Sequence, residues 1–445
     1  MRIVIVGAGA VGTHLAKMLS SENENVVLLD ENEEKLGKME SLFDLQAIVG
    51  DPTKISSLKD AGADDADLFV AVTPDESRNI TACILAHYLG AKKTVARIDN
   101  YEYLMPKHKE YFASLGVNSL IYPEQLAAEE IATNIKFCWM RQMLEFGEGA
   151  LVMVGVKVRS NASILNIPFK DLGRDNPYHI VAMQRGDETI IPRGNDVIMA
   201  DDLVCFMTTY EHIPYIRTIT GKDEFSEVHN VIIMGGSRIA VRTTKLIPSS
   251  VKVKIIESDL KRCHKLLELV DDSVMIINGD ARDPELLRSE GIEHTDVFIA
   301  LSDNSETNIL ACLAAKRAGV SRSVSEIENI DYISMAESMD IGSVINKKKL
   351  AASTIFQMML NTDVSSVKCL TFIEAVVVEF PVNGNCLITR KPVKDLALPS
   401  GANIGGLIRN GIGMNVAGNT MIEPGDHVIF FCLEHVLKKL EKYFR

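Results

Sequence analysis

The chain repeats itself, and this repeat limits the folds it can adopt more than any other feature. The segment FVAVTPDESRNITACILA returns later as FIALSDNSETNILACLAA. Asn79 corresponds to Asn308 and Cys83 to Cys312, each pair lying 229 residues apart. A repeat whose unit is about 220 residues long indicates duplicated domains, because solenoid units are far shorter.

Each copy begins with short strands that alternate with helical segments. In the first copy the strands are RIVIVG, NVVLLD, LQAIVG, LFVAVT and KTVARI. Strands rich in Val and Ile, separated by helices, are typical of a parallel sheet with helices on both faces. A long amphipathic helix and a small strand-rich module follow. We therefore predict an α/β fold of two tandem units, each a doubly wound, Rossmann-like lobe followed by a small α+β lobe.

These patterns also suggest where each part begins and ends. The polar segment GKDEFSEVHN is the expected linker between the two units. The predicted parts are a first lobe (1–120), a crossover helix (121–144), a first small lobe (145–220), a second lobe (228–345), a second crossover helix (346–363) and a second small lobe (364–445).

Composition excludes some partners and environments. The net charge is −13 and the sequence has no long basic run, so a nucleic acid is not expected as a partner. No stretch offers the roughly 18 apolar residues that a transmembrane helix needs, so we expect none. None of the eight cysteines forms a CxxC pair, which favours reduced thiols in a cytoplasmic protein.

The first strand runs directly into a glycine turn. GAGAVG supplies Gly7, Gly9 and Gly12 in the G-x-G-x-x-G spacing, between a predicted strand and a predicted helix. Gly7 permits a tight turn, Gly9 lets backbone approach a pyrophosphate, and Gly12 allows close helix packing. Asp30 follows Gly12 by eighteen residues and ends the next strand, where a carboxylate binds ribose hydroxyls and favours NAD over NADP. A plain tight turn with a solvated aspartate is the alternative.

Other candidates lie where the remaining parallel strands end, the edge at which such sheets bind ligands. Thr73 and Pro74 follow LFVAV, and Asn79 lies on the next helix. Arg97 ends another strand and could clamp a phosphate, although an ordinary salt bridge is the alternative. Asp51 could contact the ligand or cap the helix that follows it.

The second copy departs from the first at its glycine turn. The three glycines return as Gly235, Ser237 and Ala240, so two positions of close approach have gained side-chain atoms. The acidic strand end persists as Glu257, but the arginine candidate is replaced by Glu326, whose carboxylate would repel phosphate. We expect the second lobe to keep the fold and to have a weakened or lost pyrophosphate site.

The glycine turn also occurs in NAD-dependent oxidoreductases, which is the competing interpretation. The first small module offers no paired carboxylates and no His/Cys arrangement with plausible catalytic spacing. His179 and His212 are its only histidines, and neither recurs in the second copy. We therefore predict that the chain is not an enzyme; a third alternative is an assembly module that binds no ligand.

The order of a glycine turn with Asp30, then AVTPDESRNI, ARIDN, a crossover helix and a small strand-rich module resembles the RCK, or KTN, domain family. Two such units in one chain, together with the ending IPRGNDVIMADDLV, resemble the tandem RCK regulators of Trk-type potassium uptake. The resemblance covers nearly the whole chain. It implies a peripheral cytoplasmic subunit at the inner face of the cell membrane, bound to an integral membrane potassium translocator of the Trk type.

The resemblance also implies ligands and an assembly. In this family NAD(H) or ATP/ADP occupies the cleft, and the lobes assemble into rings, so a homo-oligomer is expected. The ligand-binding positions implied by the resemblance are Gly7, Ala8, Gly9, Ala10 and Val11 on the turn, Asp30 on the ribose, Thr73 and Pro74 beside the ligand, and Arg97 toward phosphate.

Overall fold

The computed structural model describes residues 1–20, 25–137, 139–172, 176–186, 188–223, 228–329, 332–339, 341–360, 366–369, 375–384, 386–433 and 436–444. These residues form two compact units. The first unit contains Met1–Ala132 and His229–Met359, and the second contains Thr133–Val228 and Leu360–Arg445. Both parallel-sheet lobes therefore belong to one unit, and both small modules belong to the other.

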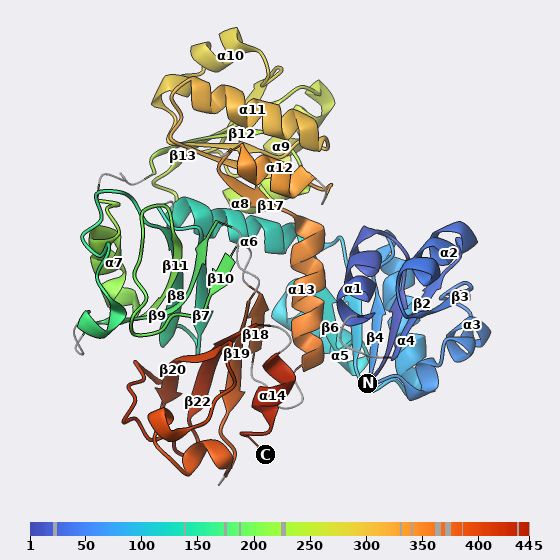
Figure 1. The fold of residues 1–445 in the computed structure, drawn as a ribbon. Helices are drawn as coiled ribbons and strands as arrows, with labels where there is room; N and C mark the ends of the chain where they lie inside the picture. The colour runs from blue at the N-terminus through green and yellow to red at the C-terminus, as the bar shows by residue number, and fades with distance from the viewer. Residues whose placement is uncertain are drawn as a thin grey trace. The chain divides into compact units, whose positions relative to one another are not determined.

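The first lobe is the predicted doubly wound sheet. Its six strands lie in the order β3-β2-β1-β4-β5-β6, and every neighbouring pair is parallel (Figure 1). The central strands β1 and β4 are almost fully buried, as their uninterrupted apolar runs IVIV and LFVA predict. The elements are β1 (Arg2–Val6), α1 (Ala10–Ser20), β2 (Asn25–Asp30), α2 (Glu33–Leu42), β3 (Gln46–Val49), α3 (Ile55–Asp60), β4 (Leu68–Ala71), α4 (Glu76–Leu89), β5 (Thr94–Arg97), α5 (Pro106–Ser114) and β6 (Ser119–Ile121).

The second lobe repeats this topology strand for strand. Its order is β14-β13-β12-β15-β16-β17, again with parallel neighbours. One difference falls beside the glycine turn, where α8 spans 7 residues and its counterpart α1 spans 11. The elements are β12 (Asn230–Met234), α8 (Arg238–Thr244), β13 (Lys252–Glu257), α9 (Leu260–Leu269), β14 (Met275–Asn278), α10 (Pro284–Ser289), β15 (Val297–Ala300), α11 (Ser305–Arg317), β16 (Arg322–Glu326), α12 (Ile333–Ser338) and β17 (Ser343–Ile345).

The two copies of one asparagine show how closely the repeat holds at atomic level. In the first lobe Asn79 donates to the carbonyl oxygens of Thr73 and Arg97, each at 2.9 Å. Asn308 donates in the same way to the carbonyl oxygens of Ser302 and Glu326, also at 2.9 Å. Both side chains are buried and tie together the carboxyl ends of two neighbouring strands.

A crossover helix follows each lobe: α6 (Pro123–Lys136) and α13 (Lys347–Leu360). The first is shorter than the expected helix over 121–144, because β7 already begins at Gln142. Met143, which lies within that expected helix, pairs instead with Val154 of β8. Trp139 and Met140 pack into the core of the small module, so tertiary burial there replaces the last helical turns.

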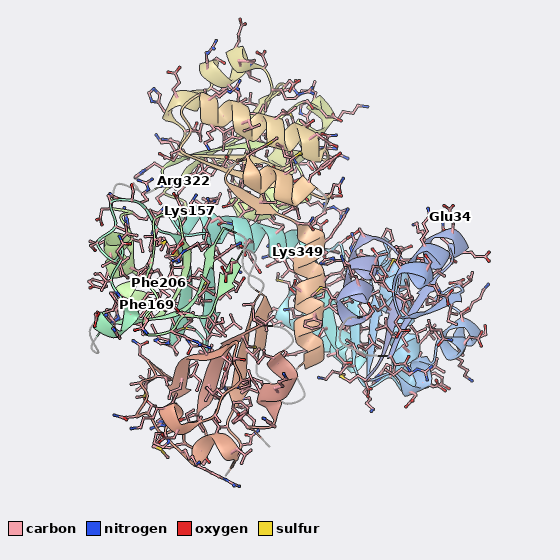
Figure 2. The ribbon with its side chains drawn as sticks, in the orientation of Figure 1. Glu34, Lys157, Phe169, Phe206, Arg322 and Lys349 are labelled. Atoms are coloured by element: carbon pink, nitrogen blue, oxygen red, sulfur yellow. The ribbon has the colours of Figure 1, made fainter. Side chains whose placement is uncertain are left out.

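The small modules are five-stranded antiparallel sheets, as the strand-rich pattern predicts. Their strand orders are β10-β9-β11-β8-β7 and β18-β19-β22-β20-β21. Phe206 is fully buried in the first module, whereas Glu34 on α2 of the first lobe is exposed (Figure 2). The elements are β7 (Gln142–Phe146), β8 (Leu151–Lys157), β9 (Tyr178–Arg185), β10 (Glu188–Ile190), β11 (Leu203–Thr208), α7 (Ile213–Ile219), β18 (Ser366–Cys369), β19 (Val376–Pro381), β20 (Ala402–Arg409), β21 (Ile412–Met414), β22 (His427–Cys432) and α14 (Leu437–Glu441).

The two small modules share one apolar core. Phe146, Met153 and Met207 of the first module belong to the same buried cluster as Val377 and Phe431 of the second. Burial of such large apolar side chains makes the pairing of the two modules stable within the chain. Six cysteines are described as free thiols, all of them buried, and no helix among the described residues is long and apolar enough to cross a bilayer.

Candidate nucleotide site

The turn after β1 has the backbone geometry that its glycines predict. Gly7 has a φ of 106°, and a Cβ there would lie 3.0 Å from the backbone nitrogen of Thr73. At Gly12 a Cβ would lie 1.9 Å from the carbonyl oxygen of Gly7, so only glycine allows α1 this close. A Cβ at Gly9 would meet nothing within 4 Å beyond its chain neighbours. Gly7 and Gly12 therefore shape the turn, and Gly9 borders open space.

The other turn residues differ in exposure. Ala8 and Val11 are buried, so only their backbone could face a ligand. Ala10 is exposed and is the first residue of α1.

Asp30 is fixed to the glycine turn by backbone hydrogen bonds. The Ala8 amide donates to its Oδ2 at 2.6 Å, and the Asn32 amide donates to its Oδ1 at 2.8 Å. An ionised carboxylate has about four acceptor positions, so two remain for further donors. The arrangement holds the carboxylate beside the turn, where the two hydroxyls of a ribose could donate to it.

Asn79 positions the neighbouring strand ends. Its Oδ1 accepts from the amide and the hydroxyl of Thr73 at 2.9 and 2.7 Å. Because both hydrogens of its amide group already bond to carbonyl oxygens, Asn79 has no donor left for a ligand. Pro74 is exposed between β4 and α4, and the carboxylate of Asp75 caps α4 by accepting from the amides of Ser77 and Arg78.

Arg97 is partly satisfied within the chain. Its Nη2 lies 3.3 Å from Oδ1 of Asp99, and Oδ2 of Asp99 lies 3.4 Å from Nη1 of Arg238 on α8. The buried Nε of Arg97 has no hydrogen-bond partner among the described residues. The salt-bridge alternative is thus present. The Arg97 side chain as a whole is 21% exposed, so a ligand oxygen would meet the terminal nitrogens of the guanidinium and not its buried Nε.

A residue that the sequence analysis missed joins acids at the carboxyl edge of the first sheet. Arg78, in the first turn of α4, makes a bidentate pair with Glu31 at 2.8 and 3.0 Å and also lies 3.2 Å from Asp51. Glu31 and Asp51 follow β2 and β3 within two residues of the strand ends, so the pair joins opposite walls of the carboxyl edge. The available signal was an arginine one turn into the helix after β4, with two acids after neighbouring strands.

Asp51 does not cap the next helix. The residue at the N-cap of α3 is Lys54, and Asp51 instead accepts from the amide and the hydroxyl of Thr53 at 2.9 and 2.7 Å. The hydrogen bond from the Thr53 hydroxyl, that from the Thr53 amide and the Arg78 guanidinium lower the pKa of Asp51. The carboxylate is therefore held in its charged form beside the cleft.

The second lobe keeps the same carboxylate geometry at Glu257. Glu257 accepts from the amide of Gly236 at 2.7 Å and from that of Asp259 at 2.8 Å, as Asp30 does from its two amides. Gly235 has a φ of 95°, so the backbone turn is also kept. A cleft of about 340 Å³ lies here, lined by residues that include Gly235, Glu257 and Arg262.

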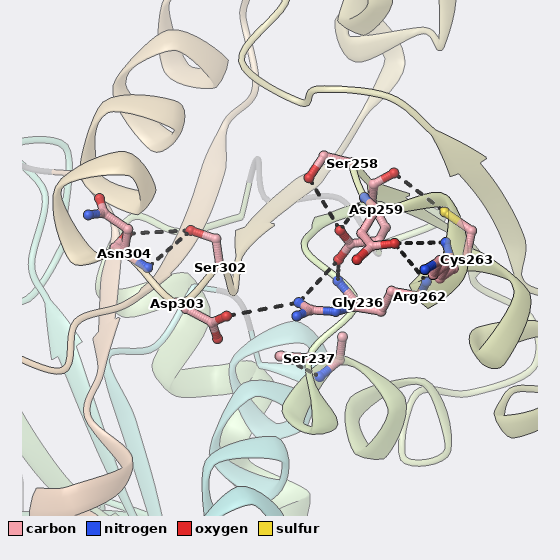
Figure 3. Close-up of polar contacts among 12 residues, drawn as sticks. Gly236, Ser237, Ser258, Asp259, Arg262, Cys263, Ser302, Asp303 and Asn304 are labelled. Carbon is pink, nitrogen blue, oxygen red and sulfur yellow. Dashed lines mark hydrogen bonds and ion pairs between the residues drawn. The ribbon is translucent and has the colours of Figure 1, made fainter.

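The phosphate end of the second turn is altered. Ser237 caps α8, since its hydroxyl accepts from the Ala240 amide at 3.3 Å. Arg262 reaches over the turn, with Nη1 3.6 Å from Glu257 and 3.9 Å from Asp303 (Figure 3). These contacts fit the predicted weakening of a pyrophosphate site, which stays a prediction.

Glu326, the counterpart of Arg97, does not stand alone as a charge. It is 4% exposed, and the Nζ of Lys347 lies 3.1 Å from it and 2.6 Å from Glu328. Burial raises the pKa of Glu326, and the Lys347 ammonium opposes that rise. Burial also acts on Glu328, but hydrogen bonds to Lys347 and Lys348 lower its pKa to about 2. Lys347 on α13 thus lies beside the end of β16, whereas in the first lobe the corresponding strand itself ends with Arg97.

Neither cleft has the makings of a metal centre. Among the described residues, no three His, Cys, Asp or Glu side chains are grouped so that they could hold a metal ion. Beside its glycine turn the first lobe offers fixed amides, an oriented carboxylate and an arginine.

The sequence matches a family at the level of whole domains. The model of the TrkA-N domain matches residues 3–123 and again residues 231–347, and that of the TrkA-C domain matches residues 377–445. The chain belongs to the TrkA family. Relatives of similar length support this: the Trk system potassium uptake protein TrkA of Haemophilus influenzae is 32% identical over 457 residues, covering 100% of this chain and 99% of the relative.

The TrkA family extends to archaea. A TrkA homolog of Archaeoglobus fulgidus is 30% identical over 447 residues, and the alignment covers 100% of both chains. Solved structures share the fold of this TrkA-family chain: the GsuK RCK domain aligns with a TM-score of 0.64 at 16% identity, covering 100% of this chain and 94% of that one. A GsuK channel bound to NAD aligns with the same TM-score and identity, covering 100% of this chain and 78% of that chain.

Proposed function

We propose that this chain is the nucleotide-sensing regulatory subunit of a Trk-type potassium uptake system. The observation that carries the proposal is the first cleft, where Asp30 is fixed to a glycine turn that opens at Gly9. The TrkA relatives, named for potassium uptake, support the role in transport. The predicted ring of lobes and the position at the inner face of the membrane belong to this proposal.

The ligand of the first cleft is NAD(H), with ATP or ADP as competitors for the same adenosine half. Asp30 receives the ribose hydroxyls and disfavours a 2′-phosphate. The amides of the turn and the N-terminus of α1 face the phosphates. Arg97, whose side chain is 21% exposed, supplies the charge-assisted hydrogen bond to a phosphate oxygen.

Gating follows from differential affinity. A nucleotide changes the translocator only if it binds one conformation of the regulator more tightly than the other. Asp99 lies between Arg97 of the first lobe and Arg238 of the second, so a phosphate that binds Arg97 also changes a contact between the lobes. This contact is one route by which the first cleft acts beyond its own lobe.

Calorimetric titration of the full chain with NADH and ATP tests the assigned cleft. Gly9→Trp places an indole in the open space of the turn, and Asp30→Ala removes the ribose acceptor; each is expected to weaken binding at least about tenfold. Ser237→Trp is the matched control, because it changes the same position of the second turn and leaves the first cleft unaltered. Affinity unchanged in both first-lobe variants would remove the assigned site.

A pull-down from membranes, with and without nucleotide, tests the partner. Capture of an integral membrane potassium translocator that depends on nucleotide, and that is altered by Gly9→Trp, supports the regulatory role. Steady oxidation of NADH with a small carbonyl substrate would instead indicate the oxidoreductase alternative.

A further inference from the structure

The second lobe retains one half of a nucleotide site and lacks the other half. Glu257 makes the two backbone hydrogen bonds that Asp30 makes, at 2.7 and 2.8 Å in place of 2.6 and 2.8 Å. Its side chain is 5% exposed and borders the cleft of about 340 Å³. The Ser258 hydroxyl donates to the same carboxylate at 3.3 Å, so one acceptor position remains for a ribose hydroxyl, and a second hydroxyl binds by displacing that of Ser258.

The missing half is the phosphate end. Ser237 has a side chain at the position where the first turn has Gly9. Its hydroxyl already accepts a hydrogen bond from the Ala240 amide, which would otherwise face a phosphate. The helix that follows is only 7 residues long. Lys347 is engaged by two carboxylates, at 3.1 and 2.6 Å, so it is not available as a phosphate clamp.

The size and charge of the cleft agree with a small ligand. Small-molecule sites span roughly 300–1,000 Å³, and this cleft lies near the lower end. Arg262 crosses it with long ion pairs, 3.6 Å to Glu257 and 3.9 Å to Asp303, and its side chain is 46% exposed. A guanidinium held this loosely can turn and stack on a planar base, as arginine does on aromatic faces.

From these contacts we infer that the cleft of the second lobe is a separate binding site for a ribonucleoside group, held by its ribose on Glu257 and its base against Arg262, with no phosphate on the turn. The two lobes then take different ligands: the first a dinucleotide or triphosphate, the second a nucleoside or the nucleoside end of a mononucleotide. The site of the second lobe is inferred from residues of that lobe alone, whereas the contrast with the ligand of the first lobe rests on the proposed function.

The site is tested in the full chain carrying Gly9→Trp, which blocks the first cleft. Calorimetry with adenosine, AMP and ADP is expected to show one site, with dissociation constants within about threefold of each other, because added phosphates find no donors on the turn. Absence of binding by all three probes would overturn the inference. Binding that strengthens tenfold or more from AMP to ADP would overturn it as well, since that result requires a working pyrophosphate turn.

Two further variants on that background identify the residues. Glu257→Gln keeps the shape of the side chain but puts an amide group in place of one carboxylate oxygen, and is expected to weaken adenosine binding about tenfold. Arg262→Ala lies on an exposed rim, where misfolding is not expected, and should weaken binding severalfold. Unchanged affinity in both variants would contradict the assigned site.

A reciprocal change tests the explanation for the lost phosphate end. The double variant Ser237→Gly and Ala240→Gly restores the three-glycine spacing and frees the capped amide. ADP is then expected to bind about tenfold more tightly than AMP. Equal affinities for ADP and AMP in this double variant would refute the proposed role of Ser237 and Ala240.

Discussion

The two glycine-turn sites of this chain share their backbone geometry and differ in the side chains around it. Asp30 and Glu257 each accept two backbone amides, and Gly7 and Gly235 each turn the chain with positive φ. An arginine also forms ion pairs at the carboxyl edge of each sheet, but the two arginines come from different helices. Arg78 reaches from α4 of the first lobe, whereas Arg262 reaches from α9 of the second.

This difference separates residues that hold the fold from residues that meet a ligand. The shared residues fix backbone groups at the carboxyl ends of the strands, and both copies need them to keep the same topology. The residues that changed, such as Gly9 to Ser237, face the space that a ligand occupies. Duplication has therefore left two sheets of one design with different chemistry at their edges.

The largest expected effect comes from removing the buried asparagine that ties two strand ends together in each lobe. Asn79→Ala leaves the amide of Thr73 and two carbonyl oxygens without side-chain partners, and Asn308→Ala does the same in the second lobe. Each change should cost about 2–4 kcal/mol of the stability of its lobe, since buried polar groups are left unpaired. Hydrogen exchange of β4 and β5, or of β15 and β16, measures the loss. A loss confined to one of the two variants would break the equivalence of the lobes.

The glycine that packs α1 against its turn should have a smaller effect, in one lobe only. Gly12→Ala puts a Cβ 1.9 Å from the carbonyl oxygen of Gly7, so backbone must shift at about 1–3 kcal/mol, and nucleotide binding should weaken with it. The second lobe accommodates alanine at the corresponding position, so Ala240→Gly should change stability by no more than about 1 kcal/mol. Thermal unfolding and NADH titration distinguish these outcomes. A tolerated Gly12→Ala would show that the first turn is as adaptable as the second.

The sequence predicted the sheets and the backbone of the site well. Apolar runs mark the central strands β1 and β4, and the spacing of Gly7, Gly9 and Gly12 identifies the turn. These signals are local, because each depends on a residue and its immediate neighbours along the chain. The asparagine match between copies was visible too, although its role in holding strand ends was not.

The remaining features depend on residues that are distant in sequence. Arg78 meets Glu31 across 47 positions, and no local pattern indicates that pair. The end of α6 was missed because Trp139 is buried in the core of the small module. A helical pattern of apolar residues does not indicate which other part of the chain buries them. The serine at position 237, where the first copy has Gly9, suggested that the pyrophosphate site of the second lobe is lost. Only the structure shows that Glu257 keeps the carboxylate geometry beside a cleft.

The arginines at the carboxyl edges of the two sheets should affect ligand binding more than stability. Both are partly exposed, and exposed ion pairs contribute about 0.2–1 kcal/mol. Arg78→Ala should therefore leave the free energy of unfolding within about 1 kcal/mol of the parent. It should alter NADH affinity by about threefold, and that affinity should then depend less on salt concentration. Arg262→Ala should leave NADH affinity at the first cleft unchanged. If both variants changed NADH affinity equally, the two clefts would not be independent.

The smallest expected effect is on the pH dependence of unfolding, and it comes from two corresponding positions in the paired small modules. His179 on β9 and Asn403 on β20 occupy corresponding positions, and their side chains meet at 3.5 Å. Burial lowers the pKa of His179 below its usual 6.5, so the folded chain favours the neutral ring. That contribution is complete above pH 6.5 and is lost as pH falls, because only the unfolded chain then gains the proton readily. The variant His179→Asn makes the two positions identical and should unfold at midpoints that change less between pH 7.5 and about pH 5 than those of the parent. Equal pH dependence in parent and variant would show that other groups govern the acid sensitivity of the paired modules.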